Sequence, residues 1–175
     1  MVHNEKKTKT LVLTAMFAAI ICVTTAFLFH IPTGVNGGYI HIGDAFIYLA
    51  ACILPKPYAM LAAAIGAGLS DAISPGGMVW VIPTMIIKPI LVLFFTSKKN
   101  TIICKQNTYA IFIAGAVGIL GYYLATGIIF GDFKVAIVSF LMGFLQPIGS
   151  GIAFMLLGGA LDKIKISEKI GTKIS

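Results

Sequence analysis

Polar residues that could bind a small molecule are concentrated in one stretch of the sequence, from His30 to Asp44, which reads HIPTGVNGGYIHIGD. This stretch places two histidines, an asparagine, an aspartate and four glycines between two strongly apolar segments. Imidazole, amide and carboxylate groups donate or accept hydrogen bonds, and glycine lets the backbone approach a ligand closely. The stretch therefore predicts a binding loop.

Three further polar residues, Asp71, Lys88 and Gln146, stand inside or next to apolar segments. A lysine near the middle of a membrane costs roughly 3 kcal/mol on insertion scales, so Lys88 should face protein or water and have a partner. We expect Asp71 to be that partner, with Asp44 as the second choice. A structural ion pair and a ligand contact both explain such a lysine. Gln146 precedes Pro147, and its amide can bond towards the protein interior.

Other candidates have a structural as well as a functional interpretation. Asp44 could bind a ligand or cap the helix that follows it. Trp80, the only tryptophan, could anchor the chain at the membrane surface or stack on a flat ligand. His41 is either a loop residue or a ligand contact. The histidines and the three cysteines show no metal-binding spacing, so no metal site is expected.

The elements that position these residues follow from the composition. Of the 175 residues, 58% are hydrophobic and 11% are charged, whereas soluble domains carry about 25% charged residues. Apolar runs recur at lengths close to the roughly 20 residues that cross a bilayer as a helix. We therefore predict one all-α integral membrane domain over residues 1–175. Its six transmembrane helices are expected at about 10–29, 42–54, 58–74, 78–96, 108–130 and 135–161.

The lysines indicate the orientation. The chain has 13 lysines and no arginine. If residues 42–74 cross the membrane twice, eleven lysines lie on the side of both termini, which the positive-inside rule makes cytoplasmic. A re-entrant loop over 42–74 would also leave both termini on the same side of the membrane, so it remains an alternative to two crossings. The lysines flank apolar spans instead of gathering on one polar face, so no nucleic-acid partner is expected.

The second span is unusually short. About 13 residues from Ile42 give roughly 20 Å of helix, which cannot cross a 30 Å apolar core unaided. Either local thinning of the membrane or burial among neighbouring helices is implied.

A face of small residues, Ala15-x-x-x-Ala19, lies on the cytoplasmic half of the first span. Such faces let helices approach closely. It serves either internal packing or the docking of a partner subunit.

Several of these segments resemble the substrate-binding S components of energy-coupling factor (ECF) vitamin transporters. The resemblance rests on Ala15-x-x-x-Ala19, on GYIHIGDAFIYLAA at 38–51, on GAGLSDAISPGG at 66–77 and on IIKP at 86–89. The segments 38–51 and 66–88 look particularly like the hydroxymethylpyrimidine or vitamin B6 branch. Pro89 departs from the family pattern, in which a glycine follows the lysine.

The resemblance implies a subunit that captures a small vitamin or precursor, with hydroxymethylpyrimidine or pyridoxine as the best match, in a bacterial plasma membrane. The partners would be a transmembrane coupling subunit, docked on Ala15 and Ala19, and two ATP-binding subunits. ATP hydrolysis would then lie on the partners, and this chain would be neither an enzyme nor a cofactor protein. We expect the stretch 30–44 to cover a pocket formed by Asn36, His41, Asp44, Asp71, Trp80, Lys88 and Gln146.

Two other classes of function are alternatives for a small membrane protein of this kind. A membrane-embedded hydrolase could use Ser70, beside Asp71, but no histidine base lies in a predicted span. A channel or scaffold subunit would need none of these side chains. Association with ATPase subunits separates an S component from both classes. The identity of the vitamin does not follow from the sequence.

Overall fold

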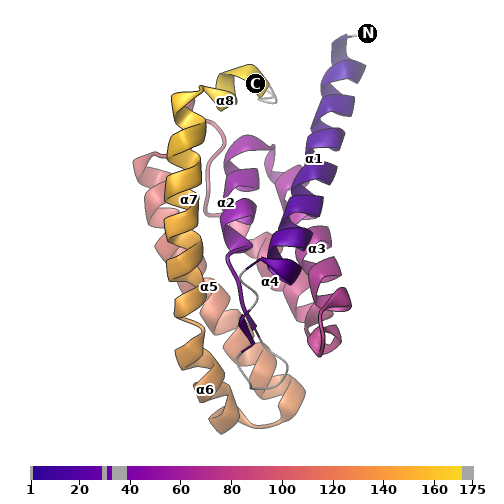
Figure 1. Ribbon diagram of the computed structural model, residues 1–175, viewed down its shortest axis with the longest axis vertical. Coiled ribbons are helices and arrows are strands. Elements are labelled where there is room, and N and C mark those ends of the chain that lie inside the picture. Colours follow the sequence, from indigo (N-terminus) through magenta and orange to yellow (C-terminus); the bar gives the residue numbers. More distant parts are fainter. Residues whose placement is uncertain (1, 29–30, 33–38, 171–175) are drawn as a thin grey trace.

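The computed structural model describes residues 2–28, 31–32 and 39–170 (Figure 1). These residues are helical apart from connections and one two-residue ladder, in which Ile31 pairs with Ile40 and Pro32 with Tyr39. The elements are α1 (Val2–Phe27), β1 (Ile31–Pro32), β2 (Tyr39–Ile40), α2 (Asp44–Ile53), α3 (Lys56–Ile73), the 3-10 helix η1 (Gly77–Trp80), α4 (Val81–Val92), α5 (Lys105–Phe130), α6 (Phe133–Met142), α7 (Leu145–Lys163) and α8 (Ile166–Ile170). The predicted helical class is confirmed.

The start of α1 and the short helix α8 lie at one end of the molecule, and the connection between α5 and α6 lies at the other (Figure 1). Among the described residues, two helical segments are long and apolar enough to cross a membrane, Glu5–Phe27 within α1 and Lys105–Phe130, which is α5. The helices Asp44–Ile53 and Gly77–Val92 are apolar but shorter. Large apolar side chains cover the outside: Ile82, Phe112 and Ile128 are 73%, 73% and 75% exposed. This outer surface is suited to contact with lipid.

Helix α2 lies at the centre of the bundle. Nine of its ten residues are buried, and it packs against α1, α3, α4 and α7. At 1.5 Å per residue it is only about 15 Å long. The neighbouring helices therefore cover α2, as the expected alternative of burial among neighbouring helices requires.

Close packing of α1 on α3 depends on Gly66. A Cβ atom at this position would lie 2.5 Å from the carbonyl oxygen of Ala18 and 2.9 Å from Cβ of Ile21. Ala15 and Ala19, in contrast, are exposed. The small face of α1 is therefore divided, with Ala18 packed inside and the other two alanines facing outward.

The final span expected at 135–161 is two helices, α6 and α7, joined at Gly143 and Phe144. Pro147 accounts for the break. In a continuous helix its ring would clash with the carbonyl of Gly143, four residues earlier, whereas in the first turn of α7 proline is tolerated.

At the end of the molecule where α5 begins, two side chains hold the connection between α4 and α5. The fully buried Asn107 accepts a hydrogen bond from the backbone N–H of Thr96 and donates to the carbonyl oxygens of Thr96 and Ile102. The carboxylate of Asp162 accepts from the N–H groups of Ile102 and Ile103, at 2.7 and 2.8 Å. These bonds connect the α4–α5 segment to α5 and α7.

Candidate functional site

A cavity of about 130 Å³ lies between α2, α3, α4, α5 and the start of α7, next to β2. Its wall combines apolar surface with a set of polar and aromatic side chains from every one of these elements. They are His41, Asp44, Tyr48, Asp71, Trp80, Thr84, Lys88, Tyr122, Tyr123, Thr126 and Gln146. An apolar cavity with a few convergent polar groups is the usual form of a small-molecule site.

An ion pair stands in the wall of this cavity. The Nζ atom of Lys88 lies 2.6 Å from Oδ1 of Asp44, with side-chain exposures of only 2% and 5%. The other carboxylate oxygen, Oδ2, accepts a hydrogen bond of 2.8 Å from Nε2 of Gln146. One carboxylate therefore joins α2, α4 and α7.

This arrangement corrects two expectations about Asp44 and Lys88. The predicted first partner of Lys88, Asp71, lies in the last turn of α3, where Gly77 of η1 packs closely on its backbone. Asp44 lies on α2, which packs directly on α4 and brings its carboxylate to the ammonium group. Asp44 also does not cap α2, since Gly43 occupies the cap position without any side-chain bond.

An aromatic ring lies next to the ammonium group of Lys88. The Nζ atom of Lys88 lies 5.1 Å from the ring centroid of Tyr122, within the range of a cation–π contact. The hydroxyl of Tyr122 shares a hydrogen bond of 2.8 Å with Thr84. Since Thr84 and Lys88 are one helical turn apart, this bond orients the tyrosine ring over the lysine.

Trp80 lies inside the protein rather than at its surface. It is 7% exposed, and its ring centroid is 6.0 Å from those of both Tyr122 and Phe130. This burial favours the interpretation as a cavity wall over that as an interfacial anchor.

His41 helps to form the turn that leads into α2. The residue is 6% exposed, and its Nδ1 atom accepts a hydrogen bond of 3.0 Å from the backbone N–H of Gly43. The same side chain also lines the cavity. The loop and ligand interpretations of His41 are therefore compatible.

Six of the seven residues predicted for the pocket lie around this one cavity, and the seventh, Asn36, lies outside the described residues, as does His30. No cluster of three His, Cys, Asp or Glu side chains able to hold a metal ion occurs in the part of the chain that the structure describes.

Sequence reasoning missed Tyr48, Thr84 and Thr126, and two further tyrosines, Tyr122 and Tyr123, also line the cavity. The periodicity of a helix could have identified two of the missed residues. Tyr48 is four residues after Asp44, and Thr84 is four residues before Lys88, so each shares a helix face with a predicted residue.

Comparison with known proteins gives one match. The family model for the ECF-type riboflavin transporter, S component, matches residues 5–163, which is nearly the whole chain and includes every described residue of the cavity wall. No curated protein and no solved structure matches. The fold, the cavity and this match agree, and the chain belongs to the ECF-type riboflavin transporter S component family.

Proposed function

We propose that this S component captures a small vitamin with a single aromatic nitrogen heterocycle, hydroxymethylpyrimidine or pyridoxine, in the cavity around Asp44 and Lys88. Membership of the family makes the chain a vitamin-binding subunit that works with ECF coupling and ATPase subunits. The observation that carries the finer proposal is the cavity itself, in which a buried polar network meets the aromatic wall of Trp80 and Tyr122.

The size of the cavity supports a single-ring ligand. Its volume of about 130 Å³ compares with the engineered cavity of about 150 Å³ that binds benzene. Riboflavin, after which the matched family is named, has three fused rings and a ribityl chain. A cavity of this size suits a pyrimidine or pyridine ring better.

Charge in the cavity wall supports an unphosphorylated ligand. The ammonium group of Lys88 is already neutralised by Asp44, and the wall contains a second carboxylate, Asp71. A phosphate ester would have to separate the buried ion pair, which leaves a buried carboxylate uncompensated. We therefore expect the free vitamin to bind more tightly than its phosphate.

The membrane topology is part of the proposal. Six crossings of a bacterial plasma membrane, with both termini cytoplasmic, are supported by the distribution of eleven lysines and by the position of the start of α1 and of α8 at one end. The cavity lies towards the other end, where the ladder of β1 and β2 is found, and would open outside the cell. If α2 and α3 form a re-entrant pair instead of two crossings, both termini and the cavity keep the same orientation.

Docking on the coupling subunit is proposed through Ala15 and Ala19. Both are exposed on α1, and both lie in the half of the predicted span 10–29 that is nearer to the lysines of the N-terminus. Small side chains at this spacing leave room for a partner helix to approach the backbone.

Calorimetry on the purified protein tests the ligand. We expect hydroxymethylpyrimidine or pyridoxine to bind, and riboflavin and pyridoxal phosphate to bind at least tenfold more weakly. Asp71→Asn and Lys88→Met should weaken binding, whereas Lys134→Met, which removes an exposed lysine, should not. Tight binding of riboflavin alone would reject the single-ring proposal, and unchanged affinity in both cavity variants would remove these residues from the site.

A further inference from the structure

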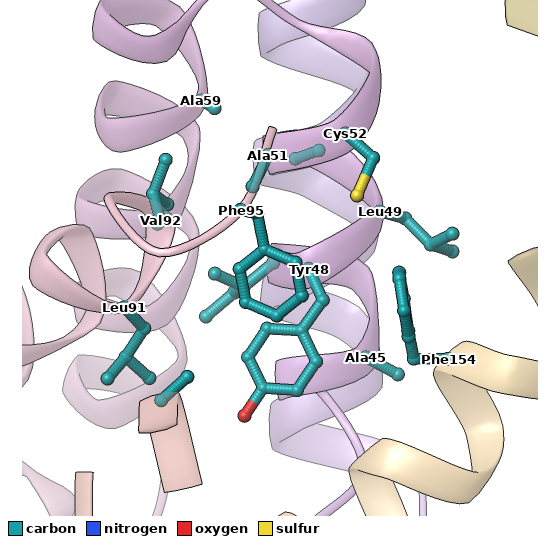
Figure 2. Close-up of a cluster of buried hydrophobic side chains, with 14 of the residues drawn as sticks. Ala45, Tyr48, Leu49, Ala51, Cys52, Ala59, Leu91, Val92, Phe95 and Phe154 are labelled. Carbon is teal, nitrogen blue, oxygen red and sulfur yellow. The ribbon is translucent and has the colours of Figure 1, made fainter. Parts of the chain in front are cut away.

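Tyr48 is held rigidly between the cavity and the hydrophobic core. The residue is fully buried, and its ring stacks on Phe95 with a centroid distance of 4.7 Å and an interplanar angle of 20°. Phe154 contacts it edge-on at 5.9 Å. Figure 2 shows the phenol ring between these neighbours, with its oxygen pointing away from the cluster of apolar side chains.

The hydroxyl group of Tyr48 has no hydrogen-bond partner among the described residues, although its oxygen is buried. Leaving a buried hydroxyl unsatisfied is unfavourable, and phenylalanine would fill the same space without that penalty. The residue lines the cavity, one helical turn after Asp44. A hydroxyl placed there is suited to a partner that enters the cavity.

The two polar groups of α2 differ in what they can offer a ligand. Both oxygens of Asp44 already accept hydrogen bonds, one from Lys88 and the other from Gln146. The hydroxyl of Tyr48 can both donate and accept. On the α2 side of the cavity, the hydroxyl of Tyr48 can therefore still bond to a ligand, whereas both carboxylate oxygens of Asp44 already accept hydrogen bonds within the protein.

We infer that the hydroxyl of Tyr48 forms a hydrogen bond with the ligand. This bond would select for ligands that carry a polar atom on the edge of the ligand ring that faces Tyr48. This inference rests on the proposed function and deepens it. A ring nitrogen would accept from the phenol, and an amino or hydroxyl group on the ring would donate to it. A ligand with only carbon at that edge would leave the phenol oxygen unsatisfied.

The test compares Tyr48→Phe with Tyr109→Phe, which removes the hydroxyl of a 68% exposed tyrosine on α5. Titrations use whichever of hydroxymethylpyrimidine and pyridoxine the wild type binds more tightly. Tyr48→Phe should lower the affinity by about 5- to 30-fold, because it would leave a buried polar atom of the ligand without a hydrogen-bond partner. Tyr109→Phe should leave it within twofold. Without ligand, Tyr48→Phe should unfold at the same temperature as the wild type or higher, because no bond within the protein is lost.

Two outcomes would overturn the inference. One is a Tyr48→Phe variant that binds the vitamin as tightly as the wild type, which leaves the capture function intact and removes Tyr48 from recognition. The other is a clear fall in the unfolding temperature of ligand-free Tyr48→Phe, which would mean that the hydroxyl has a partner in the protein. A wild type that binds neither vitamin contradicts the proposed function instead, and the ligand-free comparison still decides whether the hydroxyl is structural.

Discussion

Replacing Lys88 by methionine should destabilise the protein far more than the loss of one surface charge would. The ion pair between Lys88 and Asp44 is almost completely buried, with the charged atoms 2.6 Å apart. Removing one partner of such a pair typically costs 3–5 kcal/mol, because the remaining charge is buried without compensation. In the Lys88→Met variant, the hydrogen bond from the neutral amide of Gln146 would remain on Asp44, but no positive charge from Lys88 would compensate the carboxylate.

The expected loss of stability can be converted into a shift of the unfolding temperature. For chains of about 150–250 residues, each kcal/mol shifts the unfolding midpoint by roughly 2–4 °C. The Lys88→Met variant should therefore unfold about 6–20 °C below the wild type. The double variant Asp44→Asn/Lys88→Met removes both charges and should recover most of that difference, since neutral replacements for a buried pair are often tolerated.

Unfolding in detergent can be followed through the free cysteines with a thiol-reactive fluorophore. Cys52 is buried and becomes reactive only when the bundle opens. Lys134→Met provides the matched control, because it removes the same charge from an exposed position. It should shift the midpoint by less than about 2 °C.

Two results would refute this reasoning. A Lys88→Met midpoint within about 2 °C of that of the control would show that the pair contributes little. A double variant that is no more stable than the single variant would show that the loss comes from packing of the lysine stem and not from the stranded carboxylate.

Three further predictions concern packing, loop attachment and docking. Gly66→Val should force α1 away from α3 and destabilise the protein by about 1–3 kcal/mol, whereas Gly159→Val, at a position where a Cβ meets nothing within 4 Å, should cost less than half as much in the same thermal assay. Asp162→Ala should lose the two bonds to the α4–α5 connection, and hydrogen exchange of residues 98–104 should accelerate at least tenfold with little change in vitamin affinity; unchanged exchange would exclude this anchoring role. The double variant Ala15→Leu/Ala19→Leu should bind vitamin normally but fail to co-purify with coupling and ATPase subunits, and retained co-purification would contradict docking at this face.

The membrane character and the charged residues of the cavity wall could be predicted because charge in an apolar segment has few acceptable environments. Asp44, Asp71, Lys88 and Gln146 were identified since a buried polar group needs a partner or a cavity. Helical segments followed from apolar runs, and these signals depend only on composition and spacing.

The partner of Lys88 could not be predicted because it depends on which helix packs against α4. Asp44 and Asp71 both adjoin apolar segments that the sequence predicts to be helices, and only the central position of α2 selects Asp44. The roles of Asn107 and Asp162 were missed for a related reason. Each stands near the end of an apolar run, where a polar residue needs no special explanation.

The division of the last span was visible in principle. Pro147 follows a segment containing Gly143, and this pair is a known cause of helix breaks. The apolar run continues across the break, so hydropathy alone suggests one helix.

The stacked rings of Tyr48, Phe95 and Phe154 have an electrical consequence. They lie between the cavity at Asp44 and the Asn107 network, which begins at Cys52 one turn further along α2, and all three are buried. An ion that moved between the two polar regions along this side of α2 would have to pass these apolar rings without hydration, which is strongly unfavourable. In the proposed orientation, such a layer would let the subunit hold its ligand without discharging the membrane potential, and release of the ligand inward would require a movement of the helices or of the whole subunit.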